Sequence, residues 1–171
     1  MSWKHSAKNL VQKNQCKKSE GGGLLEQIGK CLCGAVEFKI LGQVPNFYQC
    51  YCSLCQKQTG SSHNTATLVN EHQFNWTKGQ VGIVTFTKNT GFSSHNCRQC
   101  NCPVPNLLRG TGKYWIPVGL LEGSKHTSKK NPKVVLHLHL DSKAPWQSMP
   151  EQGHQFGTMP DFTTICSLLE P

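Results

Sequence analysis

The sequence predicts an all-β (mainly β) protein built of small antiparallel sheets. Sixteen glycines and nine prolines in 171 residues indicate many turns, which favours short strands over long helices. Apolar and polar residues alternate in Val36-Glu-Phe-Lys-Ile40, so one face of this strand should meet a core and the other water. At this length the chain is expected to form one domain with a hydrophobic core.

Further strands are expected along most of the chain after residue 30. The sequences Asn89-Thr-Gly91 and Gly110-Thr-Gly112 have the composition of turns. The lysine-rich stretch 128–133 is expected to be an exposed loop, and one short helix is expected near the C-terminus. The expected strands cover residues 36–40, 47–50, 66–69, 74–76, 81–86, 91–96, 114–118 and 134–140, and the helix covers 162–169.

The N-terminal 23 residues differ in composition from the rest. Five lysines precede the first acidic residue, Glu20, and three glycines follow it. This composition predicts a mobile basic tail with a spare thiol at Cys16. A short docked helix and an organelle-targeting segment are the alternatives. No stretch approaches 18 consecutive apolar residues and none resembles a signal peptide, so we expect a soluble, cytoplasmic protein.

The formal net charge is +9, mostly from lysine. The plain interpretation of such a surplus is a lysine-rich surface in contact with water. The more specific interpretations are that the protein binds nucleic acid or an acidic small molecule. Arg98 and Arg109 are the only arginines, and no stripe of interleaved arginine and aromatic residues appears. Recognition of nucleic-acid bases is therefore not expected from the core.

Seven of the ten cysteines fall into tight groups with the spacings Cys-x-Cys, Cys-x-Cys-x-x-Cys and Cys-x-x-Cys. Without a signal peptide, such spacings favour metal binding over disulfides. A Cys-x-Cys on a strand places both sulfurs on one face, and a Cys-x-x-Cys does so through a tight turn. We predict a four-cysteine cluster, Cys31, Cys33, Cys97 and Cys100, and a three-cysteine cluster, Cys50, Cys52 and Cys55.

The two clusters predict two different zinc sites. The four-cysteine cluster would be closed and structural, joining the first expected strand to the sixth. The three-cysteine cluster would leave a fourth position free for water or substrate. Seven thiolates with two zinc ions would lower the net charge to about +6. Cys102 remains an alternative ligand, because it could replace Cys97 or complete the three-cysteine cluster and close it.

Few other residues carry a specific signal. His137 and His139 could be an acid–base pair or further ligands, although the polar face of a half-buried strand is the plainer interpretation. Lys57 could attract an anionic substrate, although a solvated lysine is more common. Cys166 is expected to be a small core residue.

Several motifs follow one another along the chain in the order of a known family. They are Gly29-Lys-Cys-Leu-Cys-Gly-Ala-Val-Glu-Phe38, Cys50-Tyr-Cys-Ser-Leu-Cys55 with Thr59-Gly60, Cys97-Arg-Gln-Cys100, and His137 with Ser142-Lys-Ala-Pro-Trp146. These motifs resemble those of the glutathione-dependent formaldehyde-activating family, which is related to centromere protein V. Tyr51 stands where this family often has histidine, Asn101 where it usually has glycine, and Asn96 where an aromatic often precedes the third motif.

The resemblance implies an Mss4-like fold with two Zn²⁺ per chain, structural in the four-cysteine cluster and catalytic in the three-cysteine cluster. It implies a carbon–sulfur lyase that reversibly joins a thiol, such as glutathione, with formaldehyde to give an S-hydroxymethyl adduct. The family domain would span residues 24–148, between the tail 1–23 and a C-terminal extension 149–171.

Two other functions remain open at this point. One is a non-enzymatic zinc module that binds nucleic acid or a protein partner through the basic tail. The other is a redox sensor, in which oxidation of an exposed cysteine cluster releases the metal.

Overall fold

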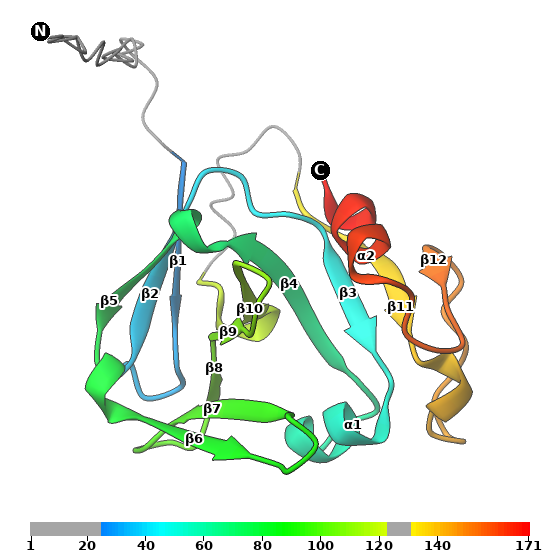
Figure 1. The fold of residues 1–171 in the computed structure, drawn as a ribbon, viewed down its shortest axis with the longest axis horizontal. Coiled ribbons are helices and arrows are strands. Elements are labelled where there is room, and N and C mark those ends of the chain that lie inside the picture. The colour runs from blue at the N-terminus through cyan, green and yellow to red at the C-terminus, as the bar shows by residue number, and fades with distance from the viewer. Residues whose placement is uncertain (1–24, 123–130) are drawn as a thin grey trace, which may run out of the picture.

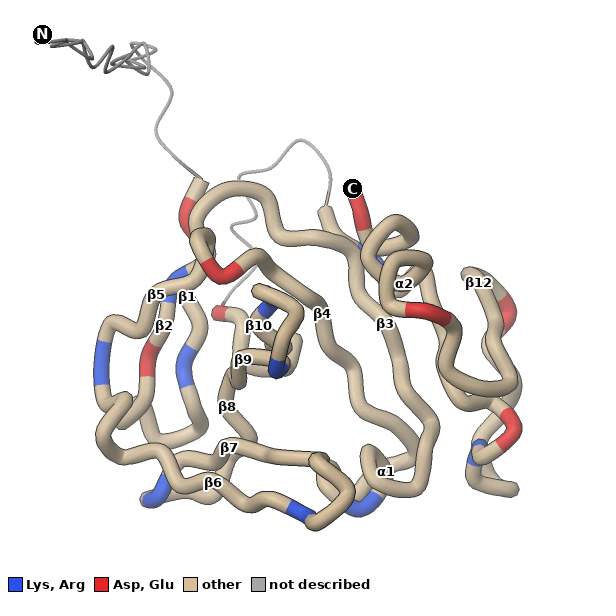
Figure 2. Tube along the Cα trace, in the orientation of Figure 1, with Lys and Arg blue, Asp and Glu red and all other residues tan. Residues whose placement is uncertain are grey.

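The computed structural model describes residues 25–122 and 131–171. Within these residues the chain forms three β-sheets, so the prediction of a mainly β protein with small sheets is confirmed (Figure 1). The predicted tail with Cys16 and part of the predicted loop 128–133 lie outside the described residues. No helix in the described part is long and apolar enough to cross a membrane. Lysine and arginine in this part are spread over all three sheets (Figure 2).

The first sheet is antiparallel, in the order β1-β2-β5. Strand β2 alternates as predicted and buries Phe38. Strand β1 was not predicted, because it buries a glutamine and a glycine and leaves Ile28 53% exposed. The buried side-chain amide of Gln27 has a hydrogen-bond partner there, because it donates to the Glu122 carbonyl (2.9 Å). The strands are β1 (Glu26–Lys30), β2 (Glu37–Leu41) and β5 (Phe74–Lys78).

The second sheet has six strands in the order β12-β11-β3-β4-β10-β9. Strand β11 pairs in parallel with both β3 and β12, which the prediction of antiparallel sheets did not include. It is buried on both faces and ends at Leu138, two residues earlier than predicted, because His139 adopts a left-handed backbone (φ 61°). The strands are β3 (Phe47–Cys50), β4 (Asn64–Asn70), β9 (Asn106–Leu108), β10 (Lys113–Pro117), β11 (Val134–Leu138) and β12 (His154–Gln155).

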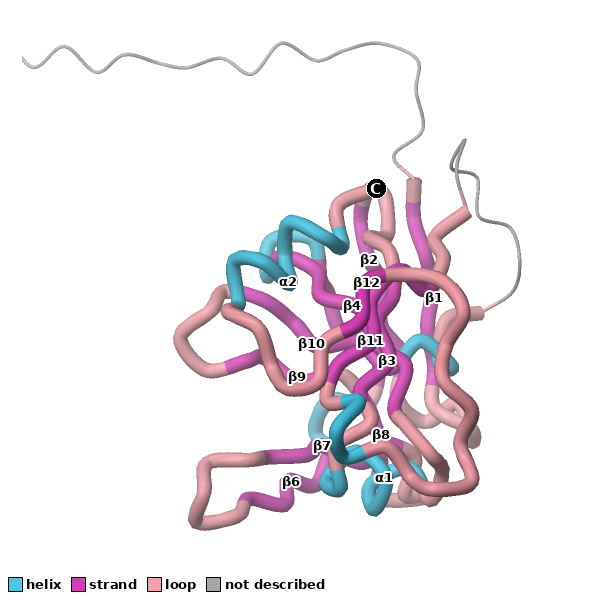
Figure 3. Tube along the Cα trace, turned by 90° about the vertical axis from the view of Figure 1, so that its right-hand side faces the viewer, coloured by secondary structure: helices cyan, strands magenta, loops and turns pink. Residues whose placement is uncertain are grey.

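The third sheet, β6-β7-β8, carries a hairpin that extends from the body of the molecule (Figure 3). The predicted turn at residues 89–91 connects β6 to β7, with Gly91 at φ 89°. Strand β6 begins two residues later than predicted, because residues 80–82 form a 3-10 helix. The strands are β6 (Ile83–Thr87), β7 (Ser93–Cys97) and β8 (Pro103–Val104).

Two α-helices complete the fold of the described residues. Helix α2 (Phe162–Leu169) has the predicted bounds, and Asp161 caps it by accepting a hydrogen bond from the Thr164 amide (2.9 Å). It packs on the second sheet, where Cys166 is half-buried beside the core. Helix α1 (Ser53–Thr59) was not predicted, because none of its residues is buried and no apolar periodicity marks it. Within residues 25–122 and 131–171, 3-10 helices span Glu71–Gln73, Gln80–Gly82, Val118–Leu120 and Leu140–Ser142.

Candidate metal centres and pocket

The four-cysteine cluster forms where two turns from different sheets meet. Cys31 and Cys33 lie in the turn between β1 and β2, and not on a strand as the prediction assumed. Cys97 ends β7, and Cys100 lies in the turn before β8. All four sulfurs lie within 4.8 Å of one another. The cluster therefore joins the first sheet to the third.

The geometry of this cluster suits a tetrahedral ion. The Sγ atom of Cys33 lies 3.6 Å from that of Cys31 and 3.8 Å from that of Cys97. Four thiolates at about 2.3 Å from zinc would lie about 3.8 Å apart. Burial raises the pKa of Cys31. The Val36 amide, which donates to the Cys31 sulfur (3.3 Å), and the thiols of Cys33 and Cys97 outweigh this effect and lower the pKa overall. These donors thus favour the Cys31 thiolate, the form that a metal requires.

The three-cysteine cluster lies where β3 passes into α1. Cys50 is the last residue of β3, Cys52 is the N-cap of α1 and Cys55 lies in its first turn, with the three sulfurs within 4.8 Å of one another. The Cys55 thiol, by donating to Cys50, lowers the pKa of Cys50 to about 6 and thereby raises its own. Gln56 fixes this segment by donating to the carbonyls of Tyr51 (2.6 Å) and Ser142 (2.9 Å).

Cys102 does not complete the three-cysteine cluster. Its carbonyl accepts a hydrogen bond from the Cys97 amide (2.9 Å), which places it beside the other cluster, yet its sulfur is not one of that group of four. Among the described residues, no further histidine, cysteine or carboxylate ligand joins Cys50, Cys52 and Cys55. This cluster therefore offers three protein ligands.

A buried polar network lies behind the three-cysteine cluster. The Tyr51 hydroxyl donates to Gln49 Oε1 (2.8 Å) and lies 3.3 Å from His137 Nδ1. His137 Nε2 donates to the Gln152 carbonyl (2.9 Å), so this nitrogen carries the proton. The network anchors Tyr51 between two cluster cysteines. His137 is buried within β11, and His139 lies beyond the end of that strand. The two histidines therefore form neither the predicted acid–base pair nor the predicted polar face of a half-buried strand.

Replacing His137 with glutamine should reduce the amount of unfolding free energy that the protein loses when the pH becomes acidic. Burial lowers the pKa of His137 below its ordinary 6.5, against the opposing effect of the Gln152 hydrogen bond. Below pH 6.5 the unfolded chain binds a proton that the folded chain does not, so the free energy of unfolding falls as pH drops from 6.5 toward the folded pKa. Urea unfolding at pH 7.5 and 5.5 should show a smaller loss in the variant; equal losses would contradict this role.

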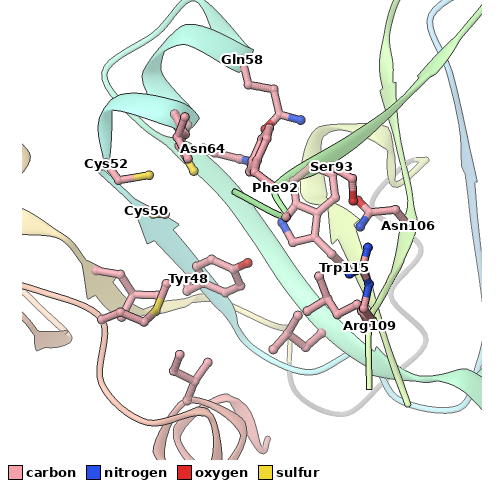
Figure 4. Close-up of a pocket in the computed structure, with 18 of the residues that line it drawn as sticks. Tyr48, Cys50, Cys52, Gln58, Asn64, Phe92, Ser93, Asn106, Arg109 and Trp115 are labelled. Atoms are coloured by element: carbon pink, nitrogen blue, oxygen red, sulfur yellow. The ribbon is translucent and has the colours of Figure 1, made fainter. Parts of the chain in front are cut away.

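A pocket of about 840 Å³ opens at the three-cysteine cluster. The β6–β7 hairpin, the turn after β9 and α2 extend from the molecule on the same side (Figure 3), and all three contribute to its lining. Tyr48, Phe92 and Trp115 give it aromatic walls (Figure 4). Its volume is in the range of small-molecule sites. His139 lines this pocket, whereas Lys57 is exposed outside the lining.

Sequence reasoning missed most of the polar lining. These residues come from separate strands and turns, and no local spacing links them to the cysteines. Arg109 was noticed only as one of two arginines. The missed polar residues include Asn64, His95, Asn106 and Arg109.

Comparison with known proteins places the chain in a family. The family model described as glutathione-dependent formaldehyde-activating enzyme matches residues 26–140, a span that contains both cysteine clusters. Among solved structures, a Rhodobacter sphaeroides protein is similar at 21% identity, with a TM-score of 0.48, over 63% of this chain and 99% of that one. On the strength of the family match, the chain belongs to the glutathione-dependent formaldehyde-activating enzyme family.

Proposed function

We propose that the protein is a zinc-dependent carbon–sulfur lyase that reversibly joins a thiol, such as glutathione, with formaldehyde to an S-hydroxymethyl adduct. Family membership supports this reaction class. The observation that carries the proposal is the position of the three-cysteine cluster, with three protein ligands, in the wall of a pocket large enough for a small thiol. A metal site with three protein ligands is typical of catalytic zinc, and one with four is typical of structural zinc.

In this proposal each cluster holds one Zn²⁺. Zinc in the three-cysteine cluster would supply an open coordination position that deprotonates a thiol or polarises an aldehyde oxygen. Such help is needed because a free thiol has a pKa of about 8.5 and is mostly protonated at neutral pH.

The chain's own residues would position the reactants and handle the proton. Tyr48 and Trp115 form the apolar walls that displace water from the reacting thiol. Joining a thiol to formaldehyde moves the thiol proton to the new hydroxymethyl oxygen, so a group that holds it in between is useful. His139 lines the pocket near Cys50, close enough for the two groups to interact electrostatically, and its neutral imidazole can accept a proton. We assign the intermediate proton to its imidazole.

The test is two-dimensional NMR exchange between glutathione and its hydroxymethyl adduct in formaldehyde. Zinc-loaded wild type should accelerate the exchange, and Cys52→Ser should reduce it to the protein-free rate, because this change removes one ligand of the open site. Cys166→Ser, which alters a half-buried thiol outside both clusters, is the control and should exchange like wild type. A protein-free rate with zinc-loaded wild type would reject glutathione as the substrate.

A further inference from the structure

One end of the pocket carries polar groups well away from the cysteines. Asn106 begins β9, and Arg109 follows that strand in the turn toward β10. Figure 4 shows both on the side of the pocket opposite Cys50 and Cys52, with Trp115 between the two ends. This end has an arginine and an amide but no described acidic residue in its lining.

The Arg109 guanidinium is available to a ligand. The three salt bridges among the described residues all join lysine to glutamate, and no described hydrogen bond involves the Arg109 side chain. A guanidinium is always charged at neutral pH and offers a planar set of donors that matches a carboxylate. Arg109 therefore supplies an anion-binding group at the pocket mouth.

Two buried asparagines add neutral hydrogen-bonding groups along the same pocket. Asn64 and Asn106 are only 6% and 5% exposed, and neither side-chain amide has a described protein partner. Among the described residues, every fully enclosed side-chain nitrogen and oxygen has a hydrogen-bond partner. Because the two amides have none, their polar atoms must be exposed to the open space of the pocket that they line. A buried amide left without a partner costs free energy unless a ligand or water satisfies it.

The strand pairing sets the order of these groups. Asn64 lies opposite Cys50 in the β3–β4 ladder, and Asn106 lies opposite Trp115 in the β9–β10 ladder. The pocket therefore runs from the cysteine sulfurs past one amide and an aromatic wall to a second amide and a guanidinium. That sequence of groups complements an extended molecule with a sulfur at one end, an amide within it and a carboxylate at the other end.

We propose that Arg109 and Asn106 form a carboxylate-binding subsite at the end of the pocket away from the cysteines, and that these two residues make the site select thiols that carry a carboxylate over thiols that do not. This inference rests on the proposed function for the position of the sulfur. It assigns substrate selection to Arg109, and not to the exposed Lys57 beside the cluster.

The test measures binding and not turnover. Isothermal titration of zinc-loaded protein with S-methylglutathione, which has no free thiol, would be compared with titration of its diethyl ester, which has no free carboxylate. Wild type should bind the ester about 10- to 100-fold more weakly, as expected for loss of a charge-assisted hydrogen bond. Arg109→Ala should weaken binding of the acid by a similar factor and should bind acid and ester alike.

Lys57→Ala removes the same charge from the surface outside the pocket, so it should bind the acid within about twofold of wild type. Equal binding of acid and ester by wild type, no binding of either, or wild-type affinity in Arg109→Ala would overturn the proposal. If the expected binding pattern appears without any acceleration of exchange, the subsite stands and the lyase proposal fails. If exchange is accelerated but the acid is not preferred, the lyase proposal stands and the subsite is rejected.

Discussion

Cys97→Ser is expected to lower the melting temperature far more than Cys52→Ser, although each variant should lose about one zinc ion per chain. Cys97 belongs to the cluster that joins the turn of the first sheet to the third sheet. Structural zinc binding contributes about 10–16 kcal/mol in small zinc domains, as large as the whole stability of a typical fold at about 5–15 kcal/mol. Losing this link should therefore separate the two sheets.

Cys52 is the matched control, because its cluster comes from one short continuous segment. Gln56 also holds that segment in place by two hydrogen bonds that need no metal. Thermal unfolding followed by circular dichroism, together with metal analysis of each purified variant, would check the prediction. Equal melting temperatures for the two variants, or two zinc ions retained by Cys97→Ser, would contradict the structural role of the four-cysteine cluster.

Phe38→Ala is expected to destabilise the protein by about 3–5 kcal/mol, the usual cost of emptying a buried phenylalanine site. Phe38 is 1% exposed and packs against the rings of Phe74 (5.5 Å between centroids) and Trp76 (6.1 Å). Its ring also lies against Gly29 on β1, where an added Cβ would come within 2.2 Å of it. The space left by alanine would thus open between two paired strands.

Phe86→Ala is the control for this prediction. Phe86 is also on a strand, but it is 58% exposed, so its loss should change the free energy of unfolding by no more than about 0.5 kcal/mol. Urea unfolding of both variants at constant zinc concentration would give the comparison. A cost below about 1 kcal/mol for Phe38→Ala would show that the core repacks around the missing ring.

Features set by local sequence could be predicted well. Helix α2 and strand β3 have the predicted bounds, because their apolar residues and flanking turns follow one another along the chain. Strand β1 could not be predicted in the same way. Its burial depends on Glu122, far away in sequence, which accepts a hydrogen bond from Gln27, and on Phe38, which occupies the space above Gly29.

The two histidines of the segment 137–139 also show the difference between what local sequence predicts and what the folded structure decides. His137 and His139 are two residues apart, and in a continuous strand they would share a face. The left-handed backbone at His139 ends the strand first, so His139 reaches the pocket and His137 is buried with Tyr51. Backbone conformation at one residue thus decided which imidazole can meet a ligand.

The sequence by itself determined the local cysteine groups, Cys31 with Cys33, Cys97 with Cys100, and Cys50 with Cys52 and Cys55, because ligands separated by one or two residues reach one point through any tight turn. Only the tertiary structure decided that Cys102 stays outside both clusters, and that Arg109 and Asn106 share a pocket with the three-cysteine cluster. These residues come from different strands and turns, and their meeting depends on how the sheets pack. Such long-range packing leaves no periodic signal in the chain.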